Sequence, residues 1–416
     1  MQLALPGSAD AAKLPTSLTS RHREIHRWFN FIAGFSPEFV ASCIDGAEGV
    51  RDGYVLDPFA GAGTTLVEAQ LAGLPATGYE PHPFFAEMAR AKLDRELTID
   101  DVSMVEALVA DSFSSRADPG AVWADTPLTF LRKLIPEPAL TQLAASPELV
   151  ESLPGRLHPI FRLVVSRTLE GTSGSKTDGV YKAPTSSKRS LEPREVLATV
   201  CSELRHDLVV ACDRTTATLI ERPAGGGIAG GASLCVTSPP YLNNFDFAEM
   251  TRMELYFWRF AESWREITET VRSQLLVNTT TAPAHLRCDE AAFRAVVDRD
   301  VFAFAERLHS KLATVCSGRT KPYDRLVYPY TSGLSEIFGR VYDALQKDAP
   351  MHVVVADSAL YGVHIRLHDL VALILAGLGF RRVTIRHLRE RGERWVLAKR
   401  KGPPGRLGEY WVSATR

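Results

Sequence analysis

The sequence predicts an α/β protein with an open, mostly parallel sheet and a helical insertion. Three observations predict this class. A short apolar run at 54–56 stops at Asp57-Pro58 and leads into a glycine-rich loop, a helix and a second apolar run, which is the order of a βαβ unit. Another apolar run, at 234–237, stops at a pair of prolines. Between the two lie residues 101–215, which contain several stretches typical of helices.

Composition restricts the function classes. The 416 residues allow two or three domains' worth of core. Lys plus Arg number 48 and Asp plus Glu 49, so the overall charge does not indicate an anionic partner. Six cysteines are scattered without a C-x-x-C pair, which fits neither a zinc site nor a disulfide framework and favours a cytoplasmic location. No metal, membrane span or signal peptide is expected.

The first motif lies in residues 53–80, GYVLDPFAGAGTTLVEAQLAGLPATGYE. Gly61 and Gly63 predict a tight turn in which the backbone approaches a ligand without interference from a Cβ atom. A helix begins at Thr64 or Thr65. The next strand, 75–79, ends at Glu80, where a carboxylate is placed to accept hydrogen bonds from ribose hydroxyls.

The second motif is CVTSPPYLNNFDF, residues 235–247. Pro239 and Pro240 cannot continue a strand, because each fixes φ and lacks a backbone donor. The predicted strand therefore ends at Ser238. Ser238, the Pro239 carbonyl and the Tyr241 ring are then presented at the carboxyl edge of the sheet, where open α/β sheets bind ligands.

Taken together, DPFAGAGTT and TSPPY resemble the cofactor and catalytic motifs of S-adenosylmethionine-dependent DNA amino-methyltransferases. The string SPPYLNNFDFAEMTRMELYFW is similar to a bacterial subgroup of DNA modification methylases. Leu66 replaces the third glycine of a dinucleotide-binding loop, which argues against NAD. The resemblance implies a Rossmann-like class I methyltransferase fold with a seven-stranded, mostly parallel sheet. It also implies S-adenosylmethionine as cofactor, DNA with a flipped base as partner, and a cognate restriction endonuclease as a possible second partner.

The resemblance implies two groups of site residues. The catalytic group is Ser238, Pro239, Pro240 and Tyr241. The cofactor-binding group is Asp57, Phe59, Gly61, Gly63, Thr64, Thr65, Glu80, Glu221 and Phe35.

The chemistry of amine methylation suits the second motif. An amino nitrogen conjugated to a ring is a poor nucleophile. Two acceptors, Ser238 Oγ and the Pro239 carbonyl, would pull it towards tetrahedral geometry, while Tyr241 stacks on the extruded base. Serine at the first position favours N4 of cytosine over N6 of adenine without settling the choice. An RNA base and a non-catalytic binding module are further alternatives.

Methylation at cytosine C5 is a rival reaction, and it requires a cysteine nucleophile. In that family a proline stands beside the cysteine. Cys235 is followed by Val236 and lies on the predicted strand, so we interpret it as a core residue.

Residues 1–48 form an N-terminal segment whose 21–40 portion resembles the part of the family that closes over the methionine end of the cofactor. Phe35 and Ser36 are the candidates there. A plain helix start at Ser36-Pro37 is the alternative. Arg23 and Arg27, together with Arg21, could form an exposed face without a partner.

The remaining organisation follows from shorter patterns. We expect the first half of the methyltransferase domain at 49–100, a helical insertion with a basic loop at 101–215 that could serve target recognition, and the second half at 216–416. Helices are predicted at 127–134, 138–145, 159–169 and 195–212, and strands at 216–221, 352–356, 382–387 and 394–398. Glu221 ends the strand at which the family often has an acid contacting the adenine.

Two stretches are locally basic. The loop 174–194 and the segment 381–406, with ten Lys or Arg against two acids, could each contact a phosphate backbone or simply be solvated. After the second motif, apolar residues 250, 253, 257 and 260 recur at helical spacing and predict core packing. Asn243, Asn244 and Asp246 could reach substrate or cap that helix.

Overall fold

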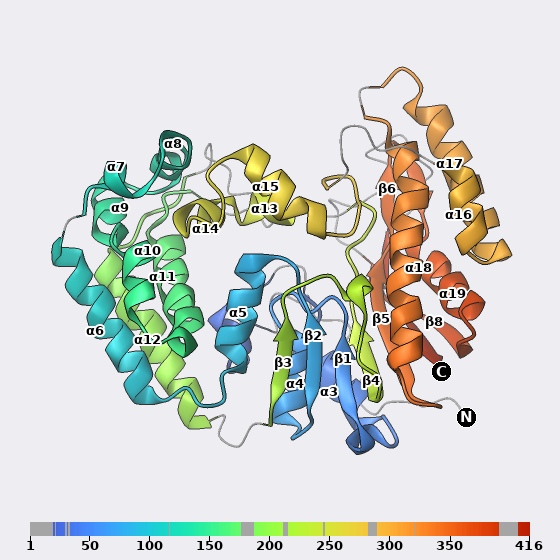
Figure 1. Ribbon diagram of the computed structural model, residues 1–416, viewed down its shortest axis with the longest axis horizontal. Coiled ribbons are helices and arrows are strands. Elements are labelled where there is room, and N and C mark those ends of the chain that lie inside the picture. The colour runs from blue at the N-terminus through green and yellow to red at the C-terminus, as the bar shows by residue number, and fades with distance from the viewer. Residues whose placement is uncertain are drawn as a thin grey trace.

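The structure is a computed structural model. It describes residues 20, 22–29, 31, 34–115, 117–175, 187–210, 215–243, 246–281, 289–319, 321–390 and 407–416. Seven strands form one sheet in the order β3-β2-β1-β4-β5-β9-β8 (Figure 1). They are β1 (Tyr54–Asp57), β2 (Ala76–Tyr79), β3 (Ala217–Ile220), β4 (Ala232–Thr237), β5 (Pro350–Ala356), β8 (Arg381–Glu390) and β9 (Gly408–Thr415).

Strands β1 to β5 pair in parallel, and β9 runs antiparallel to both of its neighbours, β5 and β8. The predicted seven-stranded, mostly parallel sheet is therefore confirmed. A separate hairpin is formed by β6 (Ser358–Leu360) and β7 (Val363–Ile365). The predicted strand at 394–398 falls outside the described residues, and the described partner of β8 is β9.

Helices cover both faces of this sheet. The helices are α3 (Pro37–Asp45), α4 (Thr64–Leu71), α5 (Pro83–Leu93), α6 (Ile99–Ser115), α7 (Pro119–Val122), α8 (Asp125–Leu134), α9 (Glu137–Leu143), α10 (Ser146–Leu149), α11 (His158–Thr172), α12 (Pro193–Val210), α13 (Phe247–Met250), α14 (Arg252–Phe257), α15 (Trp264–Thr270), α16 (Glu290–Val296), α17 (Arg299–Cys316), α18 (Val327–Ala344) and α19 (Leu367–Gly377). The four predicted helices of the insertion correspond to α8, α9, α11 and α12, whereas α6 was not predicted.

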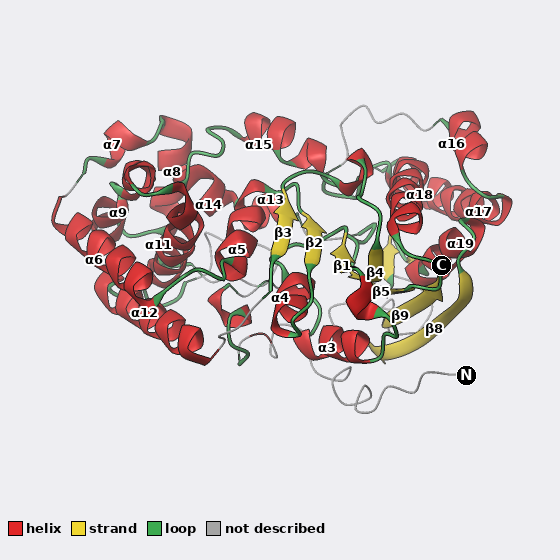
Figure 2. Ribbon diagram, turned by 60° about the horizontal axis from the view of Figure 1, so that its bottom comes forward, coloured by secondary structure: helices red, strands yellow, loops and turns green. Residues whose placement is uncertain are grey.

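The strands are apolar on both sides because both faces of the sheet are covered. Val55 and its neighbour Leu56 are fully buried but belong to two different cores. The first core contains α3, α4 and α5, and the second contains α17, α18 and α19. Figure 2 shows α3 and α4 on the face of the sheet opposite to α18. The alternation of side chains along each strand thus fills two layers at once.

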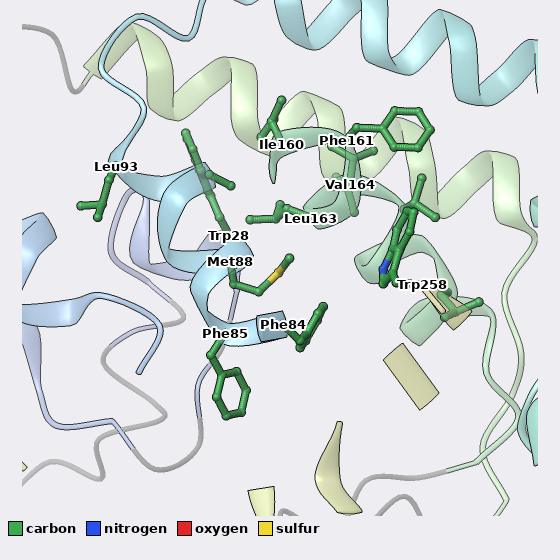
Figure 3. Close-up of a cluster of buried hydrophobic side chains, with 14 of the residues drawn as sticks. Trp28, Phe84, Phe85, Met88, Leu93, Ile160, Phe161, Leu163, Val164 and Trp258 are labelled. Atoms are coloured by element: carbon green, nitrogen blue, oxygen red, sulfur yellow. The ribbon is translucent and has the colours of Figure 1, made fainter. Parts of the chain in front are cut away.

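The helices of residues 99–210 gather at one end of the sheet, beside α5 (Figure 1). They share the first core with the sheet rather than forming a separate one. Figure 3 shows Phe84 and Met88 of α5 facing Leu163 and Val164 of α11, with Trp28 from the N-terminal segment beside them. Burial of this apolar surface stabilises the contact between insertion and sheet, at roughly 25 cal/mol per Å².

A buried carboxylate fastens the N-terminal segment to the insertion. Asp207 on α12 has no exposed surface, and it accepts hydrogen bonds from the Ile25 backbone N–H at 2.9 Å and from Trp28 Nε1 at 2.9 Å. Arg27 donates to it through Nε at 3.0 Å and pairs with it through its second nitrogen. Arg23 pairs with Glu68 at 3.5 Å. The expectation that Arg23 and Arg27 lack partners is therefore wrong, and Arg21 lies outside the described residues.

Two further findings apply to the described residues alone. None of their helices combines the length and apolarity that a bilayer crossing requires. Four of the six cysteines are described, and each is a buried free thiol (Cys43, Cys201, Cys235 and Cys316).

Replacing Asp207 by Ala is expected to lower the free energy of unfolding by about 3 kcal/mol, because it leaves a guanidinium, an indole N–H and a backbone N–H without their buried acceptor. Urea denaturation followed by tryptophan fluorescence measures this loss. Asp111→Ala on the exposed side of α6 is the matched control, with an expected change within about 0.5 kcal/mol. Equal effects of the two substitutions would contradict the anchoring role.

Candidate active site

The two loops singled out in the sequence leave neighbouring strands at the same edge of the sheet. Strands β1 and β4 pair in parallel, so 58–63 and 238–243 both begin at their carboxyl ends. The strand ends are also bonded to each other. Thr237 Oγ1 donates to Asp57 Oδ1 at 2.6 Å, and Thr65 Oγ1 donates to the Val236 carbonyl at 3.1 Å. The spatial relation on which the predicted site depends is therefore present.

A single cavity of about 300 Å³ lies between these loops, a volume at the lower end of small-molecule sites. Both loops contribute to its wall. The predicted site residues that line it are Phe35, Phe59, Gly61, Glu80, Ser238, Pro239, Pro240 and Tyr241.

The glycine loop approaches the cavity in a conformation that suits glycine. Gly61 has a φ of 53°, and a Cβ atom at this position would lie 2.8 Å from the Phe31 ring. Gly63, with a φ of 85°, precedes the first turn of α4. Any side chain at 61 would therefore strain the backbone and push into the aromatic wall.

Glu80 is the most buried acid of the cavity wall. Only 7% of its surface is exposed, and its two oxygens accept from the Gly61 N–H at 2.9 Å and the His82 N–H at 2.8 Å. Burial raises the pKa of the Glu80 carboxyl to about 7, although those two hydrogen bonds act in the opposite direction. A donor entering the cavity would meet a carboxylate with lone pairs still able to accept.

Four of the predicted cofactor residues stand behind the wall rather than in it: Asp57, Gly63, Thr64 and Thr65. Asp57 is buried, and burial raises the pKa of its carboxyl to about 6 while the Thr237 hydroxyl acts to lower it. Asp57 Oδ1 also accepts from the Phe59 N–H at 3.0 Å, which turns the chain into the glycine loop. These residues hold the loop that lines the cavity.

The second loop is held from behind as well. Tyr330 on α18 is buried and donates its hydroxyl to the Pro240 carbonyl at 2.9 Å. Asn243 donates to the Ala359 carbonyl at 3.1 Å, which ties the end of the loop to β6. Ser238 is half-buried and lines the cavity. Its hydroxyl is therefore available to a ligand from a loop fixed at both ends.

Glu221 is the predicted site residue that the structure places elsewhere. It pairs with Arg90 of α5 at 2.7 Å and does not line the cavity. Pro223 and Ala224, which follow it, do line the cavity. A contact from Glu221 to the adenine stays a prediction.

Several open alternatives are settled by local geometry. Ser36 Oγ accepts from the Phe39 N–H at 3.3 Å and so caps α3, while Phe35 lines the cavity. Asp246 caps α13 by accepting from the Glu249 N–H at 3.1 Å. Asn244 lies outside the described residues, as does most of the basic loop 174–194. Of the predicted stripe, Met253 and Phe257 are buried in the first core, Phe260 packs against it, and Met250 belongs to neither core. Cys235 lies in the second core, as predicted.

Three aromatic residues of the wall were missed by the sequence analysis. The ring of Phe31 lies 4.8 Å from that of Phe85 and 5.8 Å from that of Phe247, measured between centroids. They come from the N-terminal segment, α5 and α13. Each had a signal in the sequence, because Phe31 lies in the 21–40 portion, Phe247 ends the second motif and Phe85 follows Glu80 within the string PHPFF. The part of the wall that these three residues form is therefore aromatic.

The strongest local charge excess, 381–406, is only partly described. Arg381 pairs with Asp348 at 2.7 Å, and Arg389 pairs with Glu409 at 2.5 Å at the cavity wall. Residues 391–406 fall outside the described part. Across the described residues, no group of three or more His, Cys, Asp or Glu side chains is arranged to hold a metal.

Replacing Thr237 by Val is expected to lower the free energy of unfolding by about 1–3 kcal/mol. Valine has a volume similar to that of threonine but no hydroxyl, so the buried Asp57 carboxyl loses a hydrogen-bond donor. Chemical denaturation measures the loss. Thr218→Val, at an exposed position of β3, is the matched control and should change stability by less than about 0.5 kcal/mol. No difference between the two variants would show that the bond between the strand ends carries no stability.

Comparison with known proteins gives a partial match. No family model matches the chain. Over 93 residues the chain is 31% identical to the type II methyltransferase M.BsoBI of Geobacillus stearothermophilus, and this match covers 20% of the present chain. The chain spans only 18% of the length of that methyltransferase. Part of this protein is thus similar to a type II methyltransferase.

Proposed function

We propose that this protein is an S-adenosylmethionine-dependent DNA methyltransferase that modifies an exocyclic base amine, with N4 of cytosine favoured. One observation carries the proposal: the glycine loop with Glu80 and the Ser-Pro-Pro-Tyr loop line the same cavity. The partial similarity to a type II methyltransferase supports the same activity. Methylation of N6 of adenine, or of an RNA base, is the alternative.

The residues of the cavity fit the cofactor. Gly61 leaves its backbone bare where a side chain would close the space, and Glu80 offers acceptors suited to ribose hydroxyls. Phe31, Phe35 and Phe59 supply apolar surface, and an aromatic face also attracts a cationic sulfonium. When bound, S-adenosylmethionine supplies an electrophilic methyl group.

The second loop fits the amine. Ser238 Oγ and the Pro239 carbonyl would each accept one N–H of the base, and two acceptors in fixed positions localise the lone pair on nitrogen. The Tyr241 ring offers a face for a base taken out of the helix stack. Because Tyr330 and Asn243 hold the loop, the acceptors need little rearrangement before the reaction.

Replacing Ser238 by Ala is expected to reduce methyl transfer about 10²-fold or more, because one of the two acceptors for the amine is lost. Transfer of labelled methyl groups to duplex DNA measures the rate, and mass spectrometry of the nucleosides identifies the modified base. Binding of S-adenosylhomocysteine, followed by thermal shift, should be unchanged. Ser103→Ala on the surface of α6 is the control and should keep full activity.

Undiminished transfer by the Ser238→Ala variant would overturn the assigned chemistry. Transfer by the wild-type protein to RNA and not to DNA would favour the alternative substrate.

Cofactor affinity is expected to fall below about pH 7. A ribose hydroxyl binds the ionised Glu80 better than the protonated form, and burial raises the pKa of this carboxyl to about 7. Affinity should therefore rise with pH up to about 7 and level off above it. Calorimetric titration with S-adenosylhomocysteine from about pH 5.5 to about pH 8 measures the change. A Glu80→Gln variant should bind more weakly and without this pH dependence; an unaltered profile would exclude Glu80 as the acceptor.

A further inference from the structure

The hairpin of β6 and β7 extends the sheet edge next to the active site. It follows directly after β5, and Figure 1 shows β6 beyond the upper end of β5. Ala359 in the middle of β6 accepts the hydrogen bond from Asn243, two residues after Tyr241. The hairpin turn is only two residues further along, roughly 7 Å at the rise of a strand.

The turn presents an aromatic ring. Tyr361 and Gly362 occupy it with φ values of 49° and 87°, the left-handed pair of a tight two-residue hairpin. A tyrosine is strained there, whereas asparagine or glycine would not be. The ring is half-buried and lies 5.1 Å from the ring of Tyr323 between centroids, at an interplanar angle of 35°. Local turn preference therefore does not explain why a large ring occupies the tip.

One cation lies over this ring, and two more follow it closely in the sequence. The Arg319 guanidinium lies 4.2 Å from the Tyr361 centroid, and the Tyr361 hydroxyl contacts the Lys321 carbonyl at 3.5 Å. Arg319, Lys321 and Arg325 are exposed. Within the described part of the chain, no ion pair joins any of the three to a carboxylate. Asp324 lies between Lys321 and Arg325 in the sequence, and its Oδ2 is 3.9 Å from His309 Nε2.

The positive surface continues along α17. Arg307 and Lys311 line a groove with His364 and Arg366, opposite β7 and α19. The acid in this lining, Asp369, pairs with Arg366 at 3.0 Å. The cations that line the groove thus exceed its acids.

We propose that the Tyr361 turn and the cations Arg319, Lys321 and Arg325 form a backbone-binding surface for duplex DNA beside the active site. This inference rests on the proposed function. Guanidinium and ammonium groups without carboxylate partners can bind phosphates, and an aromatic ring beside them can contact sugars and bases. Tyr and Arg are also enriched in protein interfaces, so the test below includes a protein partner among its outcomes.

The test compares two triple variants with equal charge change. The first is Arg319→Gln, Lys321→Gln and Arg325→Gln. The control is Arg51→Gln, Arg95→Gln and Lys347→Gln, three exposed cations near the amino edge of the sheet. Duplex affinity is measured over a series of salt concentrations, and thermal shift with S-adenosylhomocysteine reports the fold and the cofactor site in both.

For the first variant, the apparent Kd should rise about tenfold or more, and the slope of log affinity against log salt should fall by about 2–3. The control should match the wild type, and cofactor binding should be unchanged in both. Equal losses of affinity in the two variants, or wild-type affinity and slope in the first, would overturn the proposal that this surface binds DNA. A protein partner would then be the remaining candidate for it. Absence of duplex binding and methyl transfer in the wild type would instead overturn the proposed function.

Discussion

The hydrogen bond from Thr237 to Asp57 joins the ends of β1 and β4 beneath the cavity. These two strands come from parts of the chain about 180 residues apart, and they are neighbours because the sheet order places β4 next to β1. A slip in their pairing would turn every side chain of one strand to the other face. The glycine loop and the Ser-Pro-Pro-Tyr loop begin directly after this bond. The shape of the cavity between them therefore depends on one register.

The cavity combines an apolar wall with a single buried acid, and the two features depend on each other. Phe31, Phe85 and Phe247 line the same cavity as Glu80, which is itself buried. In such surroundings the charged form of a carboxyl is disfavoured, although hydrogen bonds to it are stronger than in water. Two backbone N–H groups keep Glu80 oriented in this position. Preorganised acceptors of this kind confer specificity for a ligand with hydroxyl donors.

Local patterns predicted the strands well where an apolar run ended at a proline, as at Asp57-Pro58 and Ser238-Pro239. They also predicted the acid at the end of β2. Contacts between distant segments left no comparable signal. Arg27 lacks any sequence cue to Asp207, and Phe31 reaches the glycine loop only through tertiary packing. Helix α6 was likewise not predicted from its sequence. Its buried side packs against α9, α11 and α12, which are contacts between separate segments.

The N-terminal segment links two parts of the molecule that sequence analysis treats separately. Within a few residues it is bonded to Asp207 on α12, to Glu68 on α4 through His26 at 2.7 Å, and then contributes Phe31 to the cavity. Movement of the insertion relative to the sheet must therefore displace a wall of the cavity. A ligand that favours one position of the insertion and a ligand that fills the cavity are then coupled energetically, and each alters the affinity of the other by the same factor.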